Sequence, residues 1–157
     1  MLTPSRHLER IVEAIAVATA IDGVPPLAVG WATIDLDRAA GELVEALRLA
    51  PDAFEAAEDS LTLGGRCRIA TGALPEGQAI VLLEPFTEGR LAGRLARLGE
   101  GPVALWLPFA ASVVGKPVAK PGGISAGPFG SERLLAGGPA QGPYRFLIVS
   151  APGTIPP

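Results

Sequence analysis

The side chains that most often carry catalysis are scarce in this sequence. Its 157 residues include one histidine, His7, and one cysteine, Cys67. A serine or cysteine nucleophile needs a base beside it, and His7 is the sole imidazole available. His7 falls in the first turn of an expected helix, where we expect a solvated side chain. The sequence therefore offers no convincing catalytic dyad or triad.

Cys67 stands between two arginines, Arg66 and Arg68. Guanidinium groups close to a thiol favour the reactive thiolate. Successive side chains of a strand point to opposite faces, so both arginines are expected on the face away from Cys67. This pattern predicts a buried, unreactive thiol.

Two sets of charged residues have both a chemical and a structural interpretation. Glu84 follows an apolar strand and precedes Pro85, so it could serve as a general base at a pocket rim. More often such a residue caps the next helix or pairs with a nearby arginine. Arg90, Arg94 and Arg97 repeat at helical spacing and could bind an anion, although a solvated helix face with local ion pairs is commoner.

Composition excludes some classes of partner. The net charge is −3, and no basic cluster with interleaved aromatic residues is present, so we expect no nucleic acid partner. The apolar stretch from Ile11 to Ile21 is interrupted by Glu13 and is shorter than the roughly 18 residues that a spanning helix needs. We therefore expect no membrane partner and a cytoplasmic location, where a lone cysteine is unremarkable.

Hydrophobic spacing predicts three helices, over 5–20, 37–48 and 88–98. The first has an apolar stripe of Leu8, Ile11, Val12, Ile15 and Ala18. The second is expected to be capped by Asp35 or Asp37, and the third by Thr87, with Leu91, Leu95 and Leu98 on its inner face. Extended segments are expected over 27–34, 61–71, 79–84, 102–109 and 144–150. Short connections between strand runs favour an α+β fold.

Three motifs, in this order, resemble the vicinal oxygen chelate superfamily, which includes glyoxalases and bleomycin-resistance proteins. Ala28-Val-Gly-Trp-Ala-Thr-Ile-Asp-Leu-Asp37 is similar to the opening strand and helix start of such a module. Ile80-Val-Leu-Leu-Glu-Pro85 is similar to its closing strand. Gly99-Glu-Gly-Pro-Val103 is similar to the approach to a second module.

The resemblance implies paired βαβββ-type modules that form a curled mixed sheet. It assigns the first module to about 27–86, a connecting helix to 87–99 and the second module to about 101–150, within one domain over 27–150. The second module is expected to be degenerate, because Ser112 to Gly127 reads as a loop. Residues 1–26 would add an N-terminal helix and a breaker that could cover an open sheet edge, and 151–157 would form a tail.

The resemblance also implies where a metal would be held, by His, Glu or Gln from four strands. Those positions fall on Ala28, Val81, Val103 or Ala104, and close to Phe146. Alkyl and phenyl groups have no lone pair for a cation. We therefore expect no metal, no cofactor and no metal-dependent activity.

The leading hypothesis is a glyoxalase-like domain that binds a small apolar or aromatic molecule without chemistry. Trp31, Glu84, Trp106 and Phe146 are the candidate ligand-binding residues. One alternative is an interaction or scaffold subunit that forms a homodimer through the N-terminal helix or an edge strand. Another is a metal-independent enzyme that uses Glu84.

Overall fold

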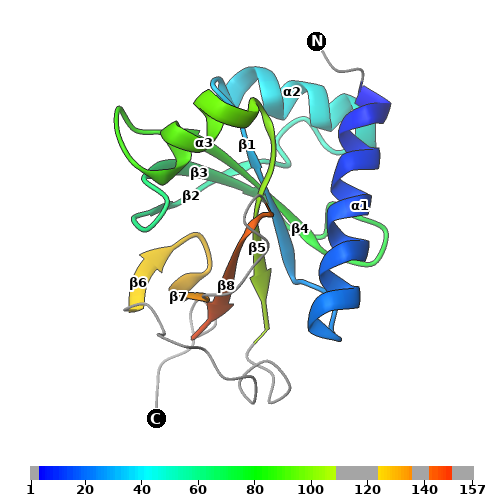
Figure 1. Cartoon of the computed structure of the whole chain (residues 1–157). Coiled ribbons are helices and arrows are strands. Elements are labelled where there is room, and N and C mark those ends of the chain that lie inside the picture. The colour runs from blue at the N-terminus through cyan, green and yellow to red at the C-terminus, as the bar shows by residue number, and fades with distance from the viewer. Residues whose placement is uncertain (1–3, 109–123, 136–141, 150–157) are drawn as a thin grey trace.

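The computed structural model describes residues 4–108, 124–135 and 142–149. In these ranges the chain forms three helices and eight strands (Figure 1). In chain order they are α1 (Pro4–Asp22), β1 (Ala28–Ala32), α2 (Leu36–Leu47), β2 (Glu55–Ser60), β3 (Gly65–Ala70), β4 (Ala79–Pro85), α3 (Arg90–Leu98), β5 (Gly101–Leu107), β6 (Ile124–Gly127), β7 (Gly130–Leu135) and β8 (Tyr144–Ile148).

All eight strands form one mixed sheet in the order β2-β3-β4-β1-β5-β8-β7-β6. The order repeats, because in each half the first strand pairs in parallel with the last strand of the same half, β1 with β4 and β5 with β8. The two halves join through the antiparallel β1–β5 pair. The prediction of an α+β fold with paired βαβββ-type modules in a curled mixed sheet is confirmed.

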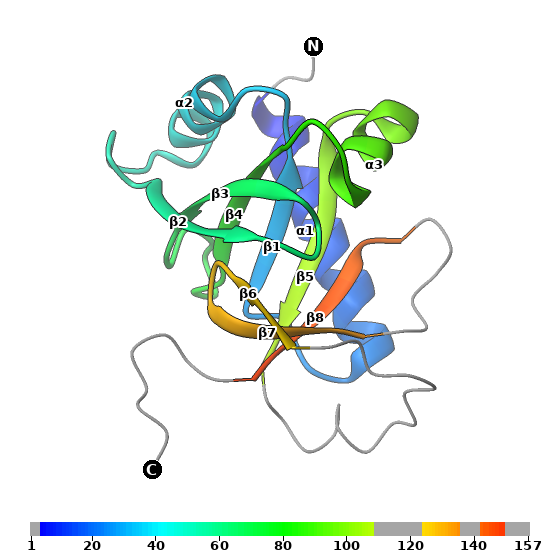
Figure 2. The ribbon, with the colours of Figure 1, turned by 90° about the vertical axis from the view of Figure 1, so that its left-hand side faces the viewer.

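The sheet curls until its two edge strands approach each other. At this seam the amide of Leu61 donates to the carbonyl of Ala126 at 3.4 Å, and the hydroxyls of Thr62 and Ser125 are 2.6 Å apart. Figure 2 looks onto this side, with β2 and β3 above β6 and β7 and with α1 behind the sheet. The curl therefore encloses an interior surface that is distinct from the outer, helix-covered face.

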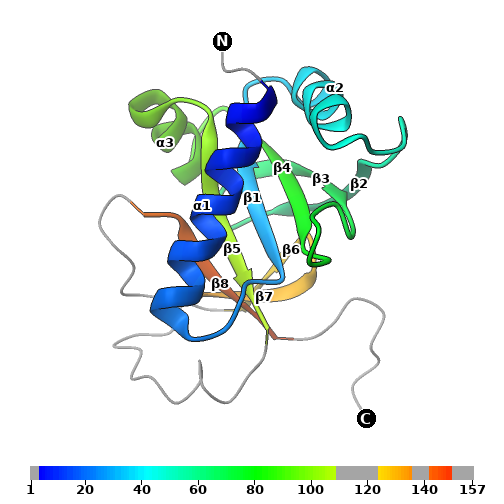
Figure 3. The ribbon, with the colours of Figure 1, turned by 90° about the vertical axis from the view of Figure 1, so that its right-hand side faces the viewer.

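Helix α1 crosses the outer face over β1 and β5, beside α2, rather than covering an edge (Figure 3). Its Ile11 and Ala18 are buried with Val29, Ile80 and other side chains of the outer face. The predicted stripe is thus largely confirmed. Val12, however, is 51% exposed, because it lies beyond the edge of the buried face.

The helix boundaries follow local chemistry. Asp35 caps α2 as predicted, accepting a hydrogen bond from the amide of Arg38 at 3.1 Å. The cap predicted for α3 is wrong: the helix begins after Gly89, whose φ of 132° is a glycine conformation, and not after Thr87. Leu98 is also 51% exposed, so the inner face of α3 is narrower than predicted.

Three strands lie where the sequence did not predict them. β2 has the polar sequence Glu-Ala-Ala-Glu-Asp-Ser, and β6 and β7 fall in a region predicted to be loops. The predicted loop from 112 to 127 is therefore wrong at its end, Ile124–Gly127, while the rest of it lies outside the described residues. The predicted tail, 151–157, lies outside them as well. No helix in the described ranges is long and apolar enough to span a membrane.

Candidate functional site

The curled sheet gathers the metal-ligand positions of the superfamily pattern into one place. Ala28, Val81, Val103, Ala104 and Phe146 all belong to a single cluster on the interior face, and each is at most 1% exposed. The strand order explains this, because β4, β1, β5 and β8 are consecutive in the sheet. All five of these side chains are alkyl or phenyl groups. No group of three potential ligands occurs among the residues that the structure describes.

Trp106 lies at the centre of this interior cluster and is fully buried. Its ring stacks on Phe146, with centroids 5.6 Å apart and planes 15° apart, and meets Phe129 edge-on at 5.6 Å. Gly30 lies directly beneath, and a Cβ at that position would be 2.8 Å from the Trp106 ring. Two of the predicted ligand-binding residues, Trp106 and Phe146, are thus together and closely packed.

A carboxylate that sequence reasoning missed is buried in the same interior. Glu132 on β7 is fully buried and accepts a hydrogen bond from Trp106 Nε1 at 2.7 Å. Ser60 Oγ, at the end of β2, lies 3.4 Å from its other oxygen. Burial raises the pKa of Glu132 to about 7, against these two hydrogen bonds, which lower it. Gly127 faces this carboxylate so closely that a side chain there would displace it.

The alternation of side chains could have indicated Glu132. Within β7, Glu132 and Leu134 are two residues apart and both face the interior, while Arg133 and Leu135 point the other way. The strand itself was not predicted, because glycine and polar residues dominate its first half.

Cys67 faces the same interior and is 4% exposed. Burial raises the pKa of its thiol to about 12, and the charges of Glu132 and Asp59 raise it further. The neighbouring arginines are engaged outside, Arg66 with Glu84 and Arg68 with Asp37. The predicted buried thiol, opposite both arginines, is confirmed.

Glu84 has a structural position at the end of β4. One carboxylate oxygen accepts a hydrogen bond of 3.0 Å from the amide of Leu36 at the start of α2. The other pairs with Arg66. Both oxygens are therefore engaged. The ion pair with an arginine is the commoner outcome that the sequence had suggested, but the helix that Glu84 caps is α2, which precedes it, and not the next helix, α3.

Trp31 lies on the outer face, away from Trp106. It packs under α1, where His7 meets it edge-on at 4.8 Å between ring centroids and Arg10 lies 5.3 Å from its ring centre. The prediction of a solvated His7 is wrong, because this side chain is 5% exposed. Its ring is buried against Trp31, with Nδ1 3.9 Å from a carboxylate oxygen of Glu42.

The arginines of α3 have separate surroundings. Arg90 donates to the carbonyl of Thr62, and Arg97 to that of Gly93 within its own helix. Arg94 is 7% exposed, donates to the Gly142 carbonyl at 2.7 Å and lies over the ring of Tyr144. The prediction of one solvated arginine face is thus wrong for Arg94, which turns inward.

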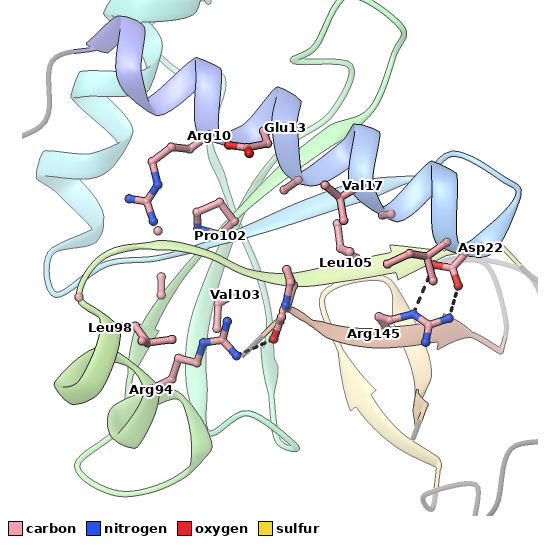
Figure 4. Close-up of a pocket in the computed structure, with 18 residues that line it drawn as sticks. Arg10, Glu13, Val17, Asp22, Arg94, Leu98, Pro102, Val103, Leu105 and Arg145 are labelled. Carbon is pink, nitrogen blue, oxygen red and sulfur yellow. Dashed lines mark hydrogen bonds and ion pairs between the residues drawn. The ribbon is translucent and has the colours of Figure 1, made fainter. Parts of the chain in front are cut away.

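A pocket of about 410 Å³ opens on the outer face between α1 and α3, with β5 as its floor (Figure 4). Its apolar lining includes Val17, Leu98, Pro102 and Leu105. The volume is in the range of small-molecule sites. None of the four predicted ligand-binding residues lines this pocket.

Four of the five charged residues that line the pocket lie at its two ends, and the fifth, Glu13 of α1, lies beside Arg10 (Figure 4). Arg10 of α1 and Arg94 of α3 lie at one end, beside the start of β5 (Figure 4). At the other end Arg145 of β8 pairs with Asp22, the last residue of α1, and both side chains are largely buried. One end of the pocket therefore has two guanidinium groups and one exposed carboxylate, and the other end has a neutral ion pair.

The fold is that of the vicinal oxygen chelate superfamily. No protein-family model matches the chain, and no curated protein matches it either. Among solved structures, it is similar to a variant of Streptomyces coelicolor methylmalonyl-CoA epimerase in complex with 2-nitronate-propionyl-CoA, with a TM-score of 0.60 and 22% identity over 83% of this chain and 97% of that one.

Two further structures show the same likeness. Methylmalonyl-CoA epimerase from Mycobacterium tuberculosis is 17% identical, with a TM-score of 0.56 over 76% of this chain and 83% of that one. A hypothetical protein from Bacillus halodurans is 18% identical, with a TM-score of 0.57 over 78% of this chain and 91% of that one. At these identities the likeness establishes the fold.

Proposed function

We propose that this chain is a glyoxalase-like domain that works without a metal and binds a small, mainly apolar molecule rather than transforming it. The observation that carries the proposal is the interior cluster, in which apolar side chains take all the ligand positions of the superfamily pattern and are packed together. A divalent cation there would lose its hydration without gaining oxygen or nitrogen donors in return.

The polar atoms of the interior also support binding without chemistry. Glu132 is the candidate proton acceptor, but its two oxygens face Trp106 Nε1 and Ser60 Oγ. A general base must lie within hydrogen-bond reach of a substrate proton. Trp106, Phe146 and Leu83 are fully buried around this site, so the packed interior favours a structural role for Glu132.

The outer pocket supports the binding part of the proposal. It combines an apolar lining with a few polar side chains, which is the usual composition of a small-molecule site. We therefore place the ligand between α1 and α3, and assign Trp106 and Phe146 to the packed interior.

Thermal shift in the presence of divalent metals tests the first half of the proposal. Zinc, nickel, manganese, cobalt and magnesium should each leave the melting temperature unchanged, and EDTA should have no effect. Saturable stabilisation by one metal at near-stoichiometric concentration would overturn the metal-independent assignment. Calorimetric titration with 1-octanol, a neutral apolar probe, tests the second half, and we expect one saturable site.

A second candidate function is homodimer formation through α1. Val12, Val17 and Ile21 of this helix are 51%, 51% and 47% exposed, and the last two also line the outer pocket. A second copy of the chain could cover such apolar side chains. Sedimentation velocity across a hundredfold range of concentration distinguishes the candidates. A dimer that dissociates in a Val12→Glu variant would favour the interaction subunit, whereas a monomer at all concentrations would exclude it.

A further inference from the structure

The outer pocket has an electrostatic polarity that bears on the kind of molecule it accepts. In the described part of the chain Arg10 forms no ion pair, and it donates to a neutral acceptor, the carbonyl of Glu100, at 3.0 Å. Its guanidinium also lies over the Trp31 ring. This contact holds the guanidinium in position and leaves its positive charge in place. An uncompensated, partly buried cation at a pocket end is suited to an anionic group.

Arg94 contributes a second positive charge at the same end. Burial is the largest effect on its guanidinium and lowers the pKa of that group, so the fold holds a cation where water is scarce. Its bond to the Gly142 carbonyl orients the guanidinium beside the pocket.

The remaining charges do not cancel this polarity. Asp22 is 1% exposed at its side chain and is committed to Arg145 at the far end. Glu13 lines the pocket from α1, but it is an exposed residue, so solvent screens its charge. Between the two ends the floor is apolar, formed by Pro102, Val103 and Leu105 of β5.

We propose that this pocket binds a small apolar acid, with its hydrocarbon part along β5 and its carboxylate at the end formed by Arg10 and Arg94. The inference rests on the proposed function, since it names the class of ligand for the same binding domain. A volume of about 410 Å³ limits the ligand to a compact aromatic acid or a short-to-medium fatty acid.

Octanoate and 1-octanol test the charge requirement, because they share a hydrocarbon chain and differ in the head group. At pH 7.5 the wild-type chain should bind octanoate about tenfold more tightly than octanol in calorimetric titration. Arg10→Gln should remove this preference while leaving octanol affinity unchanged. Arg6→Gln is the matched control, because Arg6 is an exposed residue of the same helix, outside the pocket, and the change in net charge is identical.

A pair of valines tests the location. Val17 lines the pocket and Val12 does not, and both are 51% exposed on α1. Val17→Trp should abolish the binding of both probes by filling the pocket, while Val12→Trp should bind both normally. Arg10→Lys, which keeps the positive charge, should retain most of the preference for octanoate.

The possible negative results distinguish three claims: the preference for an acid, the location of the pocket and the binding function itself. Equal affinity for octanoate and octanol, or equal effects of Arg10→Gln and Arg6→Gln, would overturn the acid inference and leave the binding function standing. Normal binding to Val17→Trp would place the ligand elsewhere and overturn the pocket assignment. Failure of both probes to bind the wild-type chain would overturn the proposed binding function itself.

Discussion

The indole Nε1 of Trp106 donates a hydrogen bond of 2.7 Å to Oε2 of Glu132 in the interior of the curled sheet. The bond joins β5 to β7, which are separated in the sheet by β8. Ser60 of β2 lies at the other oxygen of the same carboxylate, so Glu132 contacts both modules. A polar bridge of this kind fixes the packing of the interior.

Burial of the Glu132 carboxylate predicts that stability falls as pH rises. Because the pKa of Glu132 is about 7 in the folded chain and near its ordinary value of 4.5 in the unfolded chain, the folded state holds the proton more tightly. The stabilisation is complete below about pH 4.5 and is lost as pH rises through about 7. The loss is on the order of 3 kcal/mol. Urea unfolding of wild type and Glu132→Gln at pH 5 and pH 8 measures it, and the variant should lose much less stability over this range. Equal pH dependence in the two proteins would contradict the assignment.

Close packing of β1 on Trp106 predicts that Gly30 does not tolerate a side chain. An alanine Cβ would lie 2.8 Å from both the Trp106 ring and Leu83 Cδ1, and overpacking of this kind costs about 1–3 kcal/mol. Gly41→Ala is the control, because Gly41 lies within α2 with nothing near its Cβ position, and alanine there should stabilise by about 0.5–1 kcal/mol. Equal effects of the two substitutions on the free energy of unfolding would argue against a filled interior.

The ion pair between Asp22 and Arg145 predicts how α1 is held on the sheet. Their side chains are 1% and 12% exposed, so Asp22→Asn should cost about 3 kcal/mol by leaving a buried cation without its partner. Asp37→Asn, which removes the partner of Arg68, should cost at most about 1 kcal/mol, because Asp37 is 85% exposed. Chemical denaturation compares the two variants. A small, equal loss in both would show that α1 is held by its apolar contacts alone.

Burial of Cys67 predicts slow modification in the native state. With a pKa of about 12, roughly one thiol in ten thousand is ionised at pH 8, and the side chain is 4% exposed. Ellman's reagent should react slowly with the native chain and fast in 6 M guanidinium chloride. Comparable rates under the two conditions would show that the interior opens readily.

The sequence predicted those helices and strands that have clear local signals, such as a capping residue or regularly spaced apolar residues. Helix α2 is an example, since Asp35 accepts a hydrogen bond from the free amide of Arg38 and Leu43 is buried against the sheet. Strands such as β4, with five consecutive buried residues, were equally clear. β2 was missed because Glu55 to Ser60 has no β-branched or aromatic residue, and its pairing with β3 comes from the tertiary context.

Some residues of the candidate sites could be predicted from the sequence and others could not. The meeting of Val81 and Phe146 in one cluster was implied by the superfamily resemblance, which assigned each position to a strand around a shared interior. The outer pocket could not be predicted, because its lining comes from α1, α3, β5 and the residues before β8, which only the folded chain brings together. The burial of His7 likewise depends on its packing against Trp31, 24 positions further along the chain.

The metal content of the freshly purified chain tests the central claim most directly. Inductively coupled plasma mass spectrometry on protein expressed in metal-rich medium and purified without chelator should find less than about 0.1 equivalent of any transition metal, since donors are missing at the interior positions. One equivalent of zinc, nickel, cobalt or manganese, retained through gel filtration and released by EDTA with a fall in melting temperature, would contradict the account.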